Sequence, residues 1–160
     1  MRALYTVLLV FVTVSLLAQE SFTKPVYDVR LDRDSEAVEW YNNADTDSDS
    51  AYNIGHLYQT KIGDLSLAEF WYKQALNLNY KDTEITFNLA MLYEDEKKYN
   101  EAITWYKKAY VLEDTKAPNN LGYLYDTVLN DTKNAKIWYI KAIKEREFSR
   151  IKKPRTPLPL

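Results

Sequence analysis

Hydrophobic residues recur along the chain with the period of a helix, in two short phrases. Four segments follow the pattern Ala-x-x-Trp-Tyr-x-x-Ala: AVEWYNNA at 37–44, AEFWYKQA at 68–75, AITWYKKA at 102–109 and AKIWYIKA at 135–142. The offsets 0, 3, 4 and 7 place the alanines and the aromatic residues on one helix face. A second phrase repeats an apolar stripe at offsets 0, 3 and 4: NIGHLY at 53–58, NLAMLY at 88–93 and NLGYLY at 120–125. Each phrase predicts an amphipathic helix.

The two phrases alternate at an interval of about 33 residues, the length of a helical hairpin in a repeat array. This predicts three antiparallel hairpins, each with a first helix that carries the Asn–Leu–Tyr phrase and a second helix that carries the Trp–Tyr phrase. The first Trp–Tyr phrase has no partner, so a half repeat from Ser35 to Ala44, capped by Ser35, precedes the hairpins. The last helix is expected from about Thr132 to Ile151. The predicted fold class is all-α, an α-solenoid of stacked hairpins.

Gly55, Ala90 and Gly122 share one register in the three first helices. Glycine inside a helix costs about 1 kcal/mol relative to alanine. We therefore expect a packing reason at this register, namely a helix crossing too close for a larger side chain.

These phrases resemble the tetratricopeptide repeat over residues 35–147. The first and third hairpins have one extra residue between their helices, and Asp64 or Asp131 four residues before the alanine, so they are also similar to the Sel-one-like subclass. The resemblance implies a solenoid whose first helices line a concave, peptide-binding surface. The residues that carry it in the middle repeat are Ala90, Tyr93, Ala102, Tyr106 and Ala109.

The resemblance, transferred by register from the Gly or Ala position, assigns partner binding to residues of the first helices. They are Tyr52, Asn53, His56, Gln59, Phe87, Asn88, Met91, Glu94, Asn119, Asn120, Tyr123 and Asp126. The asparagines would form a ladder of amides that donate to and accept from an extended peptide; alternatively, they bond a neighbouring helix. We expect replacement of Phe87 and Asn88 by Ala to abolish partner binding and to leave the melting temperature nearly unchanged.

The two ends of the chain differ from the repeats. Residues 1–18 begin with Met1 and Arg2 and continue with sixteen uncharged residues, the pattern of a secretory signal peptide. As a helix this stretch spans about 24 Å, less than the ~30 Å hydrocarbon core, although an uncleaved membrane anchor is the alternative. We expect a flexible lead-in at 19–34, the helical-repeat domain at 35–151, and a basic proline-rich tail at 152–160. The mature chain would be exported, to the periplasm or outside the cell, with no membrane span.

Composition excludes several kinds of chemistry. The chain has no cysteine, which removes disulfides, thiolate zinc sites and cysteine nucleophiles, and His56 is its only histidine. A net charge of −2 gives no bulk attraction to nucleic acid. Asp45, Asp47 and Asp49 resemble the start of a calcium loop, but the glycine and glutamate that such a loop needs are absent, so capping of the next helix is favoured. We expect no metal, no cofactor and no enzymatic activity, including the β-lactam chemistry described for cysteine-rich secreted relatives.

The sequence therefore predicts a non-enzymatic module that binds a partner protein or peptide through the concave face. The alternative is a structural or self-assembling scaffold component of the cell envelope. Residues 141–155 contain seven basic and two acidic side chains, whereas residues 28–50 contain eight acidic and two basic ones. Opposite charge at the two ends could guide head-to-tail association, and the oligomeric state is left open. The tail also fits a polyproline-type ligand.

Overall fold

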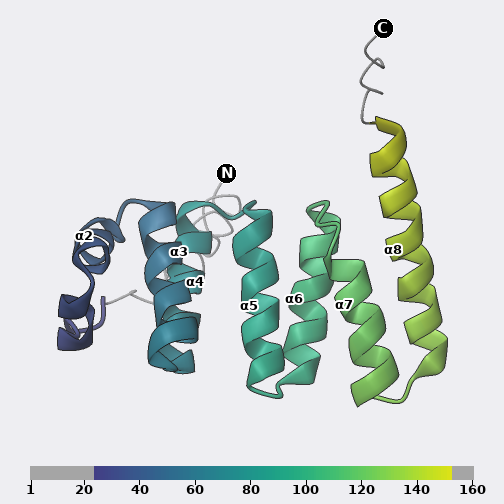
Figure 1. Cartoon of the computed structure of the whole chain (residues 1–160), viewed down its shortest axis with the longest axis horizontal. Coiled ribbons are helices and arrows are strands. Elements are labelled where there is room, and N and C mark those ends of the chain that lie inside the picture. Colours follow the sequence, from purple (N-terminus) through teal and green to yellow (C-terminus); the bar gives the residue numbers. More distant parts are fainter. Residues whose placement is uncertain (1–23, 153–160) are drawn as a thin grey trace, which may run out of the picture.

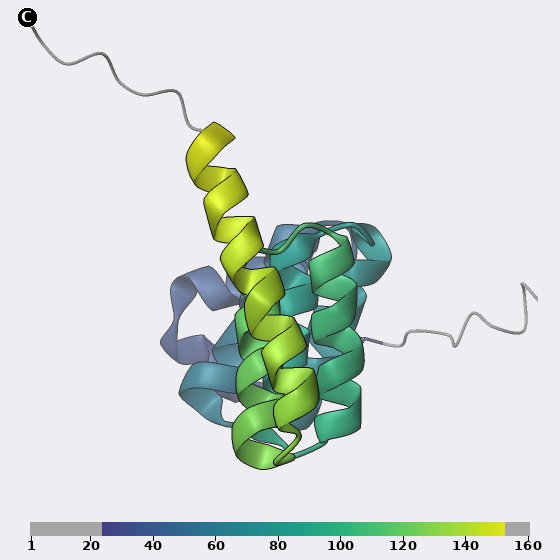
Figure 2. The ribbon, with the colours of Figure 1, turned by 90° about the vertical axis from the view of Figure 1, so that its right-hand side faces the viewer.

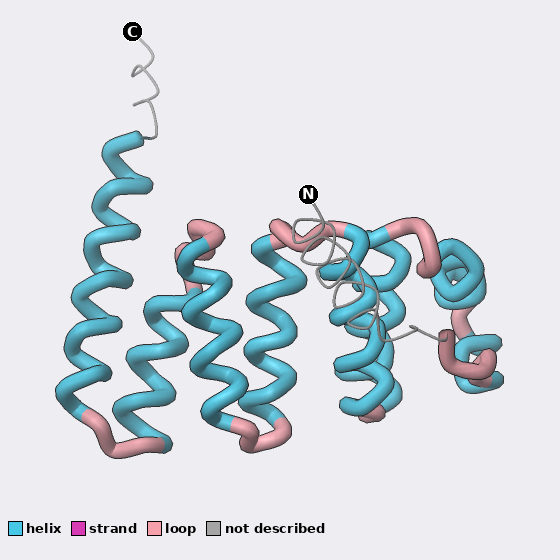
Figure 3. The backbone as a smooth tube through the Cα atoms, turned by 180° about the vertical axis from the view of Figure 1, so that it is seen from behind, coloured by secondary structure: helices cyan, strands magenta, loops and turns pink. Residues whose placement is uncertain are grey.

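A computed structural model describes residues 24–152, which form a single row of helices (Figure 1). Seen from behind, the helices alternate in direction and are joined by short turns along the upper and lower edges of the row (Figure 3). The described residues contain no strand, which confirms the predicted all-α solenoid. The α-helices are α2 (Ser35–Asn43), α3 (Ser48–Leu57), α4 (Leu65–Leu78), α5 (Thr83–Asp95), α6 (Tyr99–Val111), α7 (Ala117–Tyr123) and α8 (Thr132–Lys152).

Consecutive helices pair as three hairpins, α3 with α4, α5 with α6, and α7 with α8. Each second helix also packs against the first helix of the next hairpin, and α2 packs against α3 as a half repeat. Viewed along the row, α8 lies in front and its C-terminal end extends beyond the other helices (Figure 2). No helix of the described residues combines the length and apolar character needed to cross a membrane.

Aromatic side chains from the Trp–Tyr phrases fill the interior of the stack. Trp71, Tyr72 and Tyr106 are fully or almost fully buried. The Trp71 ring meets Tyr41 edge-on, with ring centroids 5.8 Å apart, which joins α2 to the first hairpin. Such edge-to-face pairs contribute stability beyond the area that they bury. Aromatic packing therefore supplies the cohesion of a stack that contains no disulfide.

Aspartates begin most of the helices. The side chain of Asp47 accepts a hydrogen bond from Ser50 N at 2.8 Å, which confirms that the acidic stretch before α3 caps that helix. The predicted cap Ser35 is wrong, because the side chain of Asp34 accepts from the backbone of Glu36 at 3.1 Å and Ser35 is already helical. The residues whose side chains cap α2, α3, α4, α5 and α8 are Asp34, Asp47, Asp64, Asp82 and Asp131.

The extra residue of the first and third hairpins lies in a wider helical turn. In both, the first helix ends in a π-helical turn, η2 (Tyr58–Ile62) and η3 (Leu124–Val128), whereas α5 ends without one. A left-handed residue follows in every hairpin, at Gly63, Lys97 and Asn130. The residue after it donates its N–H to the carbonyl of the tyrosine that ends the Asn–Leu–Tyr phrase. These bonds run from Asp64 N to Tyr58 O (3.0 Å), from Lys98 N to Tyr93 O (2.8 Å) and from Asp131 N to Tyr125 O (2.7 Å).

The glycine register meets a tyrosine ring of the second helix rather than a backbone crossing alone. A Cβ added to Gly55 would lie 2.8 Å from Tyr72 Cδ1 and 3.3 Å from the carbonyl oxygen of Ala68. A Cβ added to Gly122 would lie 2.5 Å from Tyr139 Cδ1. The predicted packing reason is confirmed, and the group that requires it is the tyrosine of the Trp–Tyr phrase.

The lead-in departs from the flexible segment expected at 19–34. Residues 24–34 pack against the stack through the short 3-10 helix η1 (Val29–Arg33), whose Leu31 is fully buried. Lys24 bonds Asp45, and the Tyr27 ring meets Tyr41 edge-on. A single 3-10 turn has no 3.6-residue period, so the hydrophobic pattern cannot reveal it. The expected signal peptide at 1–18, the start of the lead-in and most of the tail lie outside the described residues.

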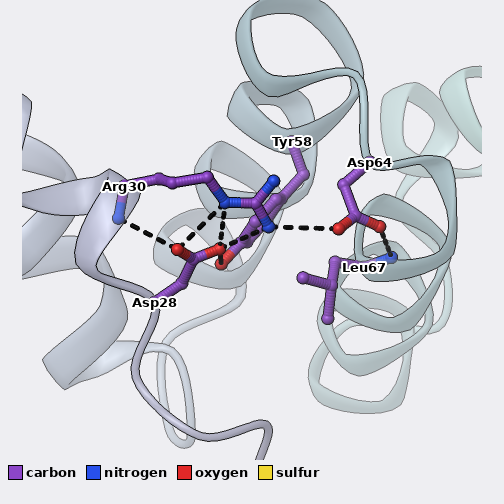
Figure 4. A network of polar contacts seen from close by, with 5 residues as sticks. All are labelled: Asp28, Arg30, Tyr58, Asp64 and Leu67. Atoms are coloured by element: carbon purple, nitrogen blue, oxygen red, sulfur yellow. Dashed lines mark hydrogen bonds and ion pairs between the residues drawn. The ribbon is translucent and has the colours of Figure 1, made fainter.

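A polar network fastens the lead-in to the first hairpin (Figure 4). Arg30 Nε donates to both oxygens of Asp28, at 3.0 and 2.7 Å, while Arg30 Nη2 donates to Asp64 Oδ2 at 3.1 Å. Tyr58 Oη donates to Asp28 Oδ2 at 3.1 Å. Hydrogen bonds from Arg30 lower the pKa of Asp28 to about 2. One hairpin later, Tyr93 in the same register donates to Glu69 of α4 at 2.6 Å, so the lead-in occupies the place of a preceding repeat.

Candidate partner-binding surface

The first helices present one common face, which we call the first-helix face. In each first helix this face consists of six positions, counted from Gly55, Ala90 or Gly122. Three of them precede that residue, by six, three and two places. The other three follow it, by one, four and five places. These positions cover about 120° of a helix with 3.6 residues per turn. The central position holds His56, Met91 and Tyr123, and all three are exposed, Met91 at 38% and Tyr123 at 52%.

Two residues predicted to bind a partner are held by the second helices. Tyr72 Oη donates to Gln59 Oε1, and Tyr106 Oη donates to Glu94 Oε2, both at 2.8 Å. Burial of the two tyrosines raises the pKa of each hydroxyl above its usual range, so both stay protonated donors near neutral pH. Gln59 and Glu94 therefore stand at fixed positions at one edge of the first-helix face.

The predicted asparagine ladder is used largely inside the stack. Asn88 Nδ2 donates to Tyr52 Oη at 2.8 Å, and Asn120 Nδ2 donates to Tyr106 Oη at 3.3 Å. Both bonds reach a neighbouring helix, as in the alternative interpretation of the asparagines. Asn53 is half-buried and lines a pocket between α2 and α3.

Phe87 does not belong to the accessible surface. Its side chain is 6% exposed, and its ring centroid lies 5.5 Å from that of Tyr106. The expectation that a variant lacking Phe87 keeps its melting temperature is therefore wrong. Tyr52 holds the same register in the first hairpin but is only half-buried, which is why the register alone misplaces Phe87.

The remaining predicted residues are accessible, and they have acidic neighbours that the sequence reasoning missed. Asn119 accepts from Arg146 of α8 at 3.2 Å, and Asp126 is exposed. Glu84 accepts from Tyr52 Oη at 3.2 Å, and Asp95 accepts from Gln59 Nε2 at 2.9 Å. Both acids lie on the first-helix face, and their spacing from Ala90 is the signal that would have found them.

Metal binding finds no support among the described residues. Within residues 24–152, no group of three or more His, Asp or Glu side chains is placed to hold a metal ion. The pocket between α2 and α3 has a volume of about 440 Å³. Its lining combines carboxylates, amides and one indole, which suits polar recognition.

A family model for the tetratricopeptide repeat matches residues 48–82 and 83–113, which are the first two hairpins and their connections. The chain is a tetratricopeptide-like helical repeat protein. Two crystal structures of MamA share this tetratricopeptide-like fold, with TM-scores of 0.62 and 0.61 at 19% and 20% identity. The aligned regions cover 66% and 71% of this chain and 62% of each MamA chain.

A curated human protein contains a related stretch. The human protein O-mannosyl-transferase TMTC1 is 41% identical over 61 residues, which are 38% of this tetratricopeptide-like chain and 7% of TMTC1. The chain thus spans a small part of that relative and about three-fifths of the MamA chains. The tetratricopeptide repeat that this chain contains is a fold that in general serves as a non-catalytic interaction module.

Proposed function

We propose that this tetratricopeptide-like chain binds a partner protein or peptide through the first-helix face. The observation that supports this most directly is the central row of His56, Met91 and Tyr123. Three hairpins present an exposed side chain at the same register, and methionine and aromatic side chains adapt readily to apolar ligand groups. The tetratricopeptide-like fold supports the same role. In this proposal the chain has no chemistry of its own and needs no cofactor.

The proposal is tested by selecting peptides from a random display library on the full chain. Selected peptides should lose most of their affinity for Met91→Ala and Tyr123→Ala, which remove exposed side chains and leave the core intact. Val111→Ala is the matched control, because Val111 is an apolar residue of α6 with 78% exposure, outside the first-helix face. Equal losses for all three variants, or selection of no peptide, would contradict the proposal.

A second candidate function is self-assembly into a scaffold of the cell envelope. Its support is the opposite charge of residues 28–50 and 141–155, together with Ile140 and Ile143, which are exposed on the last helix of the row. In solution, this candidate requires a mass that grows with protein concentration and falls with added salt. A constant monomer mass over the same range would exclude it.

We also propose that residues 1–18 direct export and are then removed. The support is their basic start, their apolar stretch and the small residue Ala18 before a polar break. Expression of the full chain in a bacterial host, followed by N-terminal mass mapping of the periplasmic and membrane fractions, tests this. A chain that retains Met1 in the membrane fraction would support the anchor instead.

A further inference from the structure

The first-helix face of the first two hairpins is strongly acidic. Its charged residues there are Asp49 on α3 and Glu84, Glu94 and Asp95 on α5, and no lysine or arginine occupies the face in these hairpins. Within the described residues, none of the four carboxylates forms an ion pair. The lysine of the face, Lys116, belongs to the third hairpin. The exposed Met91 therefore stands among carboxylates that a partner could neutralise.

The acidic face continues into the pocket between α2 and α3. Asp49 and Asn53 belong to both, and the pocket adds carboxylates from Glu36, Glu39 and Asp47. Trp40 lines the same pocket and is half-buried, and an indole face attracts a cation. Among the described residues, no basic side chain lines this pocket of about 440 Å³. The residues that line this pocket suit the binding of a guanidinium or ammonium group.

Basic charge is collected at the other end of the row. On the face of the third hairpin Lys116, beside the Phe87 ring, balances the exposed Asp126, and Arg146 of α8 bonds Asn119. The charge of the face therefore changes along the stack, although the net charge of the chain is only −2. A ligand with clustered positive charge is attracted to the α2–α5 part and repelled from α8.

We infer that the ligand of the first-helix face is a cationic peptide segment that carries apolar side chains between its basic residues. This inference rests on the proposed function and names the chemistry of its partner. The segment lies across α5 and α3, with an apolar side chain on Met91 and basic residues beside Glu84 and Asp95. One arginine or lysine enters the pocket beside Trp40.

The probe is a fluorescein-labelled peptide of alternating Arg and Leu, compared with peptides of alternating Gln and Leu and of alternating Glu and Leu. Fluorescence anisotropy with the full chain measures binding of each. We expect the Arg–Leu peptide alone to bind, with an affinity that falls at least about tenfold when the ionic strength rises from about 0.05 to about 0.5 M.

Paired neutral substitutions locate the binding. Glu84→Gln with Asp95→Asn tests the face, and Glu36→Gln with Glu39→Gln tests the pocket. Glu101→Gln with Glu113→Gln is the matched control, because both residues are exposed acids outside the face and the pocket, and the change in net charge is equal. We expect losses of about tenfold for the face and pocket variants and less than about twofold for the control.

Three results would overturn the inference, and they separate it from the proposed function. Equal losses for the control pair would mean non-specific attraction. Binding of the Gln–Leu peptide that depends on Met91 would keep the proposed function and reject a cationic partner. Self-association of the chain that the Glu84/Asp95 pair abolishes would assign the face to a second copy. If the peptides selected from the display library also fail to bind the first-helix face, the proposed function itself is wrong.

Discussion

The middle hairpin and its two neighbours close the same turn with different numbers of residues. In the first and third hairpins the bonded carbonyl and N–H are six residues apart, and in the middle hairpin they are five apart. The N–H follows the left-handed residue in every case. Because η2 and η3 absorb the extra residue inside a wider helical turn, the second helix starts from the same place. The geometry of closure is thus conserved, and the length of the hairpin is not.

Two further differences accompany the wider turn. The outer hairpins have glycine against the tyrosine ring and aspartate as the cap of the second helix. The middle hairpin has Ala90 at the glycine register, and Lys98 at the cap position makes no side-chain cap. Lys98 instead pairs with Glu96 at 3.1 Å. The middle hairpin therefore depends more on its apolar core and less on side chains that cap the free backbone N–H groups of its second helix.

The largest expected effect tests this dependence at Phe87. Phe87→Ala should lower the free energy of unfolding by about 3–5 kcal/mol, because it leaves a cavity beside Tyr106. Tyr52→Ala, at the same register of the first hairpin, should cost clearly less because Tyr52 is only half-buried. Chemical denaturation followed by circular dichroism measures both. Equal losses of unfolding free energy in the two variants would contradict the greater dependence of the middle hairpin on its apolar core.

The glycine register gives the next effect. Gly55→Ala should destabilise by about 1–3 kcal/mol, because the Tyr72 ring is buried and hydrogen-bonded and cannot move aside easily. Gly122→Leu should cost at least as much, since its Cβ would lie 2.5 Å from Tyr139. Ala90→Gly is the comparison in the middle hairpin, and it should cost at least about 1 kcal/mol, because it loses helix propensity and the packing of a fully buried methyl group. A neutral Gly55→Ala would show that the ring contact does not require glycine.

Loss of a helix cap should have a smaller effect on the free energy of unfolding. Asp64→Ala and Asp131→Ala should each cost about 0.5–2 kcal/mol, since each removes the acceptor for a free N–H at the start of α4 or α8. Asp64→Ala also loses the contact with Arg30, so Asp131→Ala is the cleaner measurement. Lys98→Asn should stabilise the chain if it forms the missing cap. Loss of stability in Lys98→Asn would mean that the ion pair with Glu96 outweighs a cap.

The smallest effect concerns the joint between the lead-in and the first hairpin. The pKa of Asp28 is lowered to about 2, chiefly by hydrogen bonds from Arg30, so the folded state favours the ionised carboxyl. The ionised Asp28 carboxyl therefore stabilises the folded state above its unfolded pKa of about 4, and this stabilisation is lost as the pH falls toward 2. The melting temperature of Asp28→Asn should therefore fall less than that of the wild type between pH 4 and pH 2. Parallel curves for the two proteins would show that Asp28 does not couple the lead-in to the stack.

Much of the fold is predictable because the repeated phrases carry it. Trp71 and Tyr72 are buried as their helical offsets require, and Gly55 and Gly122 are constrained as their shared register suggests. The extra residue is visible in the spacing, but its place in a π-helical turn is not, since that depends on which carbonyl the next helix can reach. Leu31 was missed because one buried residue in a short turn has no period.

The candidate surface is less predictable than the fold. Register identifies His56, Met91 and Tyr123 as accessible. Register alone cannot decide that Phe87 packs on Tyr106 or that Asn88 bonds Tyr52, because both depend on the angle between adjacent hairpins. The prediction of partner binding at these positions has a physical basis only for the side chains that remain accessible.

The wider turn at the end of the first helix has a consequence for how such chains change over evolution. A single codon gained or lost in this turn leaves three features in place. They are the backbone hydrogen bond that Asp64 N makes to Tyr58 O and its counterparts, the left-handed residue, and the start of the next helix. Elsewhere in a first helix, the same event would rotate every later side chain by about 100° and bury charge. Length variants of this array should therefore accumulate at this one position and leave the order of the stacked helices untouched.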